Sequence, residues 1–226
     1  VKVNSRKLHQ GLFEKLGVQD DAKLCRAVLR VVDKVDKIGE KGVVDELGPG
    51  RVDLESGARI PGLGLDGVLV RTVGEFLEVG RGQGSRRAVL AALEPLVKDT
   101  KSGDEGLAEL VRMDEILSAL GYGDDRVVFD PTVARGLAYY TGPVFEAVSL
   151  LELRDAKGNL RRFGSICGGG RYDGLVEHLL GLRVGATGAS VGVDRLLDLL
   201  LLVEQEKSRS GLDGRPGSGR LGPVLV

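Results

Sequence analysis

Tryptophan is missing from this sequence of 226 residues, aromatic residues make up only 4% of it, and cysteine and histidine occur twice each. The two cysteines, Cys25 and Cys167, cannot form the disulfide framework of a small secreted domain, and they lack the spacing of zinc ligands. His9 and His178 have no partner at metal-binding spacing either. We therefore expect no metal site, and we expect a reducing, cytoplasmic environment.

Long apolar runs and a dominant charge are also absent. The longest apolar run, residues 196–203, is interrupted by Asp198 and falls far short of the ~18 residues that a membrane span requires. The net charge is −1, so no global basic field attracts nucleic acid, although a local patch can still do so. With 42% hydrophobic and 29% charged residues, the composition is typical of a soluble globular protein without a membrane partner.

The first half of the chain is dominated by helical periodicity. Residues 1–3 alternate like the end of a strand, Asn4 or Ser5 is suited to cap a helix, and Gly17 is placed to end it. Apolar residues recur at helical spacing from about Asp20, and again over 40–47, 70–79, 85–97 and 104–120. Among these helices, the stretch 48–66 contains Gly and Pro and predicts an irregular loop.

Polar and helix-breaking residues interrupt this pattern at several points. Asp33 and Asp36, together with neighbouring lysines, indicate a solvated helix face. Pro95 is expected to bend or end its helix. Asp114 is the one polar member of a stripe that otherwise consists of Leu107, Leu110, Val111, Leu117 and Leu120. Gly121 is placed to end that last helix.

The second half changes to β character. Residues 126–129 predict a short strand, and 139–153 predict a long one. The turn chemistry of 155–159 lets 160–166 return as an antiparallel hairpin partner. The small residues of 186–191 are typical of a central strand, followed by a helix over 193–206. The whole pattern predicts a mostly antiparallel α+β body that is interrupted by a helical insert.

Arg135 and the tyrosines after it form the first candidate site. Arg135 precedes Gly136 before the predicted long strand, where a guanidinium can reach a cleft and bind a carboxylate or phosphate through two hydrogen bonds. Tyr139 and Tyr140 are adjacent on that strand, so their side chains should point to opposite faces. A surface arginine and two packing tyrosines are the simpler interpretation, and generic properties alone favour it.

A second candidate site lies at 167–174. Three consecutive glycines at 168–170 break the chain before a predicted short helix, leave backbone amides uncovered and let a ligand approach closely. Arg171 and Asp173 can pair, and Tyr172 offers a ring or a hydroxyl. The alternative is a tight loop in which glycine serves only the backbone angles.

The third candidate segment, 188–196, contains the G-x-S-x-G pattern of a hydrolase nucleophile at Ser190. That fold requires a histidine after the serine, and both histidines precede it, so we expect Ser190 to be structural. Arg195 lies near the start of the helix that follows. There it can face a phosphate beside the sheet, or it can equally be a solvated helix residue.

Taken together and in this order, the three segments resemble the histidyl-tRNA synthetase family. The run R-G-L-A-Y-Y at 135–140 is similar to the family's first histidine signature, usually R-G-L-D-Y-Y, with Ala138 in place of the acidic residue. Residues 169–173 resemble the second signature, and 192–196 resemble class II motif 3. Residues 1–6 are similar to the strand that enters the family's helical insertion domain, and residues 32–37 to the V-D-K-L-D-K of its longer insertions.

The resemblance implies a fold and an organisation of the chain. The fold is α+β, a class II synthetase-type sheet with flanking helices and an α-helical insertion domain. Residues 1–19 are then the entry strand and helix of the catalytic core, 20–122 the insertion, and 123–207 the core with the histidine signatures and motif 3. Residues 208–222 are a flexible linker, and 223–226 begin an anticodon-binding domain.

The resemblance also implies a role for each site residue. Arg135 contacts the carboxylate of histidine and the α-phosphate of ATP, and stabilises the charge that develops as the carboxylate attacks phosphorus. Tyr139 and Tyr140 line the histidine pocket, where a hydroxyl can bond the imidazole. Arg195 binds the γ-phosphate of ATP. The backbone positions assigned to ATP or the adenylate are Gly169, Gly170 and Gly192.

The implied reaction joins L-histidine to tRNA(His) through histidyl-adenylate, with ATP as substrate and Mg²⁺ bound to it, in a cytoplasmic homodimer. Class II motifs 1 and 2 are expected upstream of Val1, so we expect these 226 residues not to aminoacylate tRNA by themselves. The alternative is a non-catalytic relative, such as a histidine-sensing regulatory subunit of ATP phosphoribosyltransferase or an RNA-binding paralogue. Retention of Arg135, Tyr139, Tyr140 and Arg195 favours the enzyme.

Overall fold

The structure, a computed structural model, describes residues 1–81, 84–135, 139–155, 158–161 and 163–209. They form two compact units, of which the first contains 1–147 with 167–190. The second contains 148–166 and, of the described residues, 191–209. Three predictions lie wholly or mostly outside the described residues: the Gly136 to Ala138 part of the first signature, the final strand and the linker. Of the predicted linker only residues 208 and 209 are described, and they belong to a helix.

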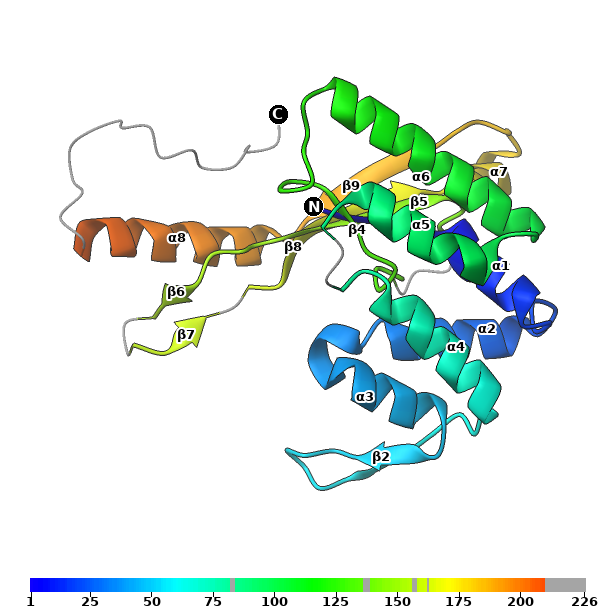
Figure 1. Cartoon of the computed structure of the whole chain (residues 1–226). Helices are drawn as coiled ribbons and strands as arrows, with labels where there is room; N and C mark the ends of the chain where they lie inside the picture. The colour runs from blue at the N-terminus through cyan, green and yellow to red at the C-terminus, as the bar shows by residue number, and fades with distance from the viewer. Residues whose placement is uncertain (82–83, 136–138, 156–157, 162, 210–226) are drawn as a thin grey trace. The chain divides into compact units, whose positions relative to one another are not determined.

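A five-stranded sheet in the order β4-β1-β5-β8-β9 carries the candidate site (Figure 1). β1 (Lys2–Ser5) runs parallel to β4 (Val128–Phe129) and antiparallel to β5 (Pro143–Val148), with Val3 opposite both Phe129 and Phe145. β8 (Ser165–Arg171) and β9 (Thr187–Val191) complete the sheet. The predicted α+β fold with a mostly antiparallel sheet is thereby confirmed.

Eight helices are described; seven begin within three residues of where the sequence pattern places them, and the third begins at Val35, five residues before the predicted 40. The helices of the first half are α1 (Arg6–Lys15), α2 (Ala22–Val32), α3 (Val35–Leu47), α4 (Gly67–Glu78), α5 (Arg86–Val97) and α6 (Lys101–Ala119). The second half adds α7 (Asp173–Leu180) and α8 (Val193–Arg209). Ser5 is the residue that caps α1, because its hydroxyl accepts a hydrogen bond from the Lys7 amide. No helix in the described part of the chain is long and apolar enough to cross a membrane.

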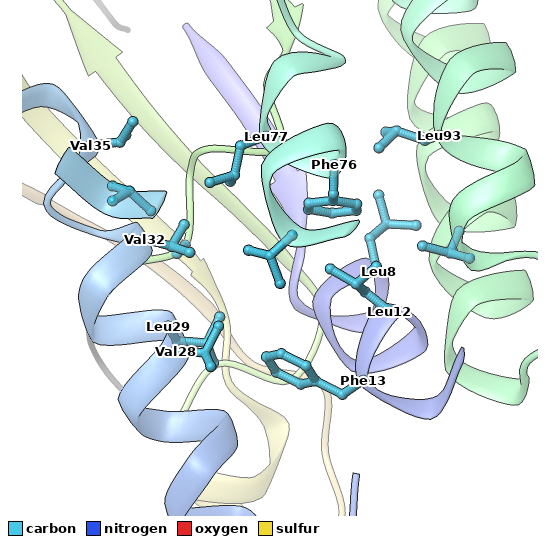
Figure 2. Close-up of a cluster of buried hydrophobic side chains, with 14 of the residues drawn as sticks. Leu8, Leu12, Phe13, Val28, Leu29, Val32, Val35, Phe76, Leu77 and Leu93 are labelled. Atoms are coloured by element: carbon cyan, nitrogen blue, oxygen red, sulfur yellow. The ribbon is translucent and has the colours of Figure 1, made fainter. Parts of the chain in front are cut away.

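The helices of the first half share one apolar core with β1 and β4. Figure 2 shows the side chains that α1, α2, α4 and α5 contribute to it, among them Leu8, Leu12, Phe13, Val28, Val32, Phe76 and Leu93. Each such side chain stabilises the fold by roughly 1.5–3 kcal/mol when fully buried. α1 and α6 approach closely, because a β-carbon on Gly11 would lie 2.5 Å from the α-carbon of Gly103. Val3 of β1 belongs to the same core, so the core holds β1 in place.

The prediction of an irregular loop over 48–66 is wrong in part. β2 (Gly50–Val52) and β3 (Arg59–Pro61) pair there as an antiparallel hairpin beside α3, with Gly50 opposite Pro61. Gly50 has a φ of 102°, which only glycine adopts readily. Strands of three residues are too short for period-two alternation to be visible in the sequence.

Asp114 of α6 lies in the helix stripe that the sequence predicts, and it is buried. Val111 and Leu120 were assigned to the same stripe, and for these two the prediction is wrong, because both are exposed. The guanidinium of Arg86 on α5 donates to Asp114 at 2.7 Å and is itself only 4% exposed. A buried carboxylate is stable when a hydrogen-bonded cation compensates it, so the polar residue is part of the helix–helix contact.

The β region differs from the prediction at three places. The glycines at 168–170 do not break the chain but lie inside β8, and β5 begins at Pro143, so Tyr139 and Tyr140 precede the strand. β9 is the outermost strand of the described sheet and mostly exposed, whereas its small residues predicted a central strand. The predicted hairpin is confirmed: β6 (Leu153–Arg154) pairs with β7 (Leu160–Arg161).

Candidate active site

Arg135 has an unusual backbone conformation. Its φ is 48°, and among the described residues Asp99 is the only other non-glycine residue with a positive φ. A left-handed conformation costs a non-glycine residue roughly 1–2 kcal/mol, so the surrounding structure must hold it in place. Such strain is common at functional sites, where it directs a side chain that ordinary backbone angles would place elsewhere.

Two side chains from the start of the chain hold the segment before Arg135. The buried amide of Asn4 donates to the carbonyl oxygens of Pro131 and Val133, both at 3.1 Å. The guanidinium of Arg6 donates to the carbonyl oxygen of Ala134 at 3.0 Å. Three carbonyl groups directly before Arg135 are thus fixed by β1 and the first residue of α1.

The Arg135 side chain lies against β8 and is paired with β5. Its Nη1 donates to Oε1 of Glu146 at 3.2 Å, and both side chains are mostly buried. A β-carbon on Gly168 would lie 2.6 Å from the guanidinium carbon, so the cation occupies the space that a side chain at 168 would fill. A guanidinium carries five N–H donors, and the contact with Glu146 uses one of them.

The Tyr140 ring lies over Gly170 of β8. A β-carbon on Gly170 would lie 2.8 Å from its ring, and Gly170 is two residues after Gly168 in β8. Residues two apart in a strand face the same side, so Arg135 and Tyr140 lie on one face of β8. Gly169 faces the other side, where a β-carbon would meet the ring of Phe145 at 2.7 Å. The three glycines therefore admit protein side chains from both sides, and their proposed contact with the adenylate remains a prediction.

Tyr139, Tyr140 and Tyr172 form an aromatic cluster. The prediction that Tyr139 and Tyr140 point to opposite faces is wrong, because their ring centroids are 4.7 Å apart with planes at 50°. Tyr172, from the turn between β8 and α7, lies 5.9 Å from Tyr139 and 6.4 Å from Tyr140. Tyr140 is buried and Tyr139 is 37% exposed. The adjacent Tyr140 hydroxyl, and to a lesser extent burial, raise the pKa of Tyr139, so the Tyr139 phenol is neutral at neutral pH.

Asp33 was expected to belong to a solvated helix face, and it is exposed. It caps the end of α2 and remains in contact with solvent. Partial burial raises the pKa of Asp33, and the positive charge of Arg135 opposes that rise.

Arg195 and Gly192 belong to the second compact unit. The Arg195 guanidinium donates to the carbonyl oxygen of Ser165 at 2.8 Å, and the Gly192 amide donates to that of Ile166 at 2.9 Å. Arg195 is exposed in the first turn of α8, so most of its donors face solvent. Ser190 lies within β9 rather than on a sharp strand-to-helix turn, which removes the geometric basis for a hydrolase nucleophile.

Several residues that support the site were not identified as site residues from the sequence. They are Asn4, Arg6 and Glu146, each of which contacts Arg135 or the segment before it. Their partners lie up to 129 residues away along the chain, so local patterns cannot reveal them. Within the ranges that the structure describes, no group of three or more His, Cys, Asp or Glu is placed to hold a metal ion.

A mostly antiparallel sheet flanked by helices, with an arginine and tyrosines gathered on one face of a strand, is the architecture of a class II aminoacyl-tRNA synthetase. The crystal structure of histidyl-tRNA synthetase from Nostoc sp. PCC 7120 superposes on it with a TM-score of 0.65 and 27% identity. The match covers 90% of this chain and 42% of that one.

Sequence comparison identifies one family among the class II aminoacyl-tRNA synthetases. A model of the histidyl-tRNA synthetase family matches residues 68–196, more than half of the chain. The chain therefore belongs to the histidyl-tRNA synthetase family. Along its whole length it is 46% identical to a histidine–tRNA ligase of Ruegeria sp. (strain TM1040) and 44% identical to one of Paracoccus denitrificans (strain Pd 1222). It spans 43% of the length of each of these relatives.

Proposed function

We propose that the natural protein carrying these residues is a histidine–tRNA ligase. It activates L-histidine with ATP, releasing pyrophosphate, and transfers the histidyl group from the adenylate to tRNA(His). Mg²⁺ enters bound to the phosphates of ATP, and the working form is a cytoplasmic homodimer. Family membership supports this reaction, and the placement of Arg135 beside Tyr140 on one face of β8 is the observation that carries it.

Arg135 is suited to the activation step. The carboxylate of histidine attacks the α-phosphorus of ATP, a new C–O–P bond forms, and the bond to pyrophosphate breaks. Negative charge increases on the oxygens around phosphorus as this happens, and a fixed guanidinium stabilises it. The contact with Glu146 leaves further N–H donors of Arg135 for the carboxylate and the α-phosphate.

Tyr139 and Tyr140 are suited to selecting the amino acid. A neutral phenol can exchange a hydrogen bond with an imidazole nitrogen, and a pocket built on such bonds rejects apolar side chains because its polar groups would lose their partners. We assign the γ-phosphate to Arg195 and the adenylate backbone contacts to Gly169, Gly170 and Gly192. Residues 20–122 remain our proposed insertion domain.

The experiment is histidine-dependent exchange of pyrophosphate into ATP by the natural protein. Exchange should require L-histidine, should not respond to other amino acids, and should fall at least roughly a hundredfold in Arg135→Ala. Arg87→Ala is the matched control, because Arg87 is 82% exposed and lies outside the site. Histidine binding without exchange would indicate a histidine sensor instead, and neither binding nor exchange would contradict the proposal.

A further inference from the structure

Asp173, the first residue of α7, connects three segments around the tyrosine cluster. Its Oδ2 accepts from the Arg171 guanidinium at 2.7 Å, and its Oδ1 accepts from the Ala186 amide at 2.8 Å. The Tyr172 amide donates in turn to the carbonyl oxygen of Ala186 at 2.8 Å. One carboxylate thus joins the end of β8 to the segment that enters β9.

The backbone of Asp173 reaches the third segment, which follows the tyrosine pair. Its amide donates to the hydroxyl of Thr141 at 3.2 Å, and the Thr141 amide donates to the carbonyl oxygen of Arg171 at 2.8 Å. The Arg171 side chain also passes over Gly142, where a β-carbon would lie 3.2 Å from it. Residues 141 and 142 are therefore held against the end of β8.

These bonds act on the tyrosines because of where they occur in the chain. Thr141 directly follows Tyr140, and Tyr172 directly precedes Asp173. The Tyr172 ring packs against the buried cluster of Val133, Tyr140 and Val144, and its hydroxyl lies against Gly188 of the β9 strand. A shift of residue 141 or of residue 172 relative to β8 would move a ring of the cluster by a similar amount.

We propose that Asp173 is a positioning residue for the amino-acid pocket: by joining Arg171, Thr141 and Ala186 it fixes Tyr140 and Tyr172 relative to each other. This inference rests on the proposed function, since it takes the tyrosine cluster as the histidine pocket. Asp173 itself does not touch the substrate. It acts through the two backbone segments that carry the rings.

The exposure and charge of Asp173 indicate that it positions the tyrosines rather than stabilises the folded protein as a whole. The Asp173 side chain is 35% exposed and the Arg171 side chain 49%, and exposed ion pairs contribute little to folding stability. The first cause of the lowered pKa of Asp173 is the Ala186 amide, and Arg171 acts in the same direction, so the carboxylate is charged at neutral pH. Removing the carboxylate breaks the bonds to Arg171 and Ala186 and keeps the backbone bond to Thr141. It should therefore loosen the segment at 186 directly and the segment at 141 and 142 through the released Arg171 side chain, without unfolding the protein.

The test compares Asp173→Ala and Asp173→Asn with Glu177→Ala in the natural protein. Glu177 is the matched control because it lies one turn further along α7, pairs with Arg183 at 2.6 Å and is exposed, but bonds neither Thr141 nor Ala186. Asp173→Ala should raise the KM for L-histidine roughly tenfold or more, and leave the KM for ATP within about twofold. Asp173→Asn, which keeps an oxygen for the Ala186 amide, should retain part of the affinity for histidine.

Hydrogen exchange supplies a readout that does not depend on activity. The amides of Thr141, Tyr172 and Ala186 should exchange faster in Asp173→Ala than in Glu177→Ala, while the melting temperatures of the two variants stay close. Equal amide exchange in the two variants, or an equal KM for histidine, overturns the positioning role. If the unmodified protein shows no histidine-dependent reaction, the proposed function fails and this role fails with it; if it reacts and the two variants behave alike, only this role fails.

Discussion

The guanidinium of Arg135 occupies the place that a side chain on Gly168 would take, with its carbon 2.6 Å from the position of that missing β-carbon. Real β-carbons essentially never come so close to another heavy atom. Arg135 can therefore lie flat on β8 only while residue 168 is glycine. Glycine in a strand interior often marks such a close approach of another group.

Gly168→Ala should displace Arg135 and lower the kcat of pyrophosphate exchange by roughly a hundredfold, because a misplaced guanidinium no longer meets the developing charge. The control is Gly67→Ala at the start of α4, where a β-carbon meets nothing within 4 Å. That variant should keep full activity. Comparable losses in both variants would show that the close contact at 168 is not what matters.

Asn4→Ala should lower both stability and activity. It leaves the carbonyl oxygens of Pro131 and Val133 without their buried donor, which costs about 1–3 kcal/mol of folding free energy. It also loosens the segment that holds Arg135, so kcat should fall by more than the unfolded fraction explains. Urea titration and exchange kinetics on the same samples separate the two effects. Asn159→Ala, at an exposed turn, should change neither.

Arg86→Ala and Arg87→Ala remove two partners of the same carboxylate. Arg86 is 4% exposed and Arg87 82% exposed, and both donate to Asp114. Arg86→Ala removes the buried partner of Asp114 and leaves it only the exposed Arg87, so it should cost about 3–5 kcal/mol of unfolding free energy. Arg87→Ala should cost at most about 1 kcal/mol, because water screens the exposed pair. Equal losses in a urea titration would mean that burial does not set the strength of this contact.

His9 should make the protein sensitive to mild acid. Burial, and then the positive charge of Arg6, lower the pKa of His9 to about 3. The unfolded chain binds a proton near pH 6.5 that the folded protein excludes, so stability falls as pH drops below about 6.5, and the fall continues to about pH 3. The loss should reach about 2 kcal/mol at pH 5.

Urea titrations of the unmodified protein and of His9→Gln between pH 7.5 and pH 5 measure this effect. Glutamine does not titrate, so the variant should lose less stability over the interval, whatever its stability at pH 7.5. His9 packs against Phe76 with ring centroids 5.3 Å apart, so some loss at every pH is expected from the changed contact. Identical slopes for the two proteins would exclude His9 as the titrating group.

Local signals in the sequence predicted the ends of many elements. The Ser5 cap and the φ of 77° at Gly121 depend on residues within one helical turn, and such interactions are visible in the sequence. The β2–β3 hairpin was missed because three-residue strands carry too little alternation. The pairing of Asp114 was not predicted because its partner Arg86 is 28 residues away, and no local pattern shows whether a carboxylate is paired.

The site was predicted by the order of three motifs rather than by periodicity. Generic strand geometry placed Tyr139 and Tyr140 on opposite faces, but these residues precede the strand that begins at Pro143. Backbone hydrogen bonds with two distant residues shape this segment instead. The Arg6 amide donates to the carbonyl oxygen of Gly142, and the Thr141 amide donates to the carbonyl oxygen of Arg171. Long-range bonds of this kind are fixed only once the sheet has formed.

The contact between Tyr140 and Gly170 restricts how this protein can vary in evolution. A methyl group at 170 would lie 2.8 Å from the ring and 2.7 Å from the backbone carbonyl oxygen of Pro143. A smaller residue at 140 removes the first of these contacts and leaves the second. Position 170 should therefore stay glycine in relatives whose residue 140 varies, whereas a tyrosine at 140 should occur only together with glycine at 170.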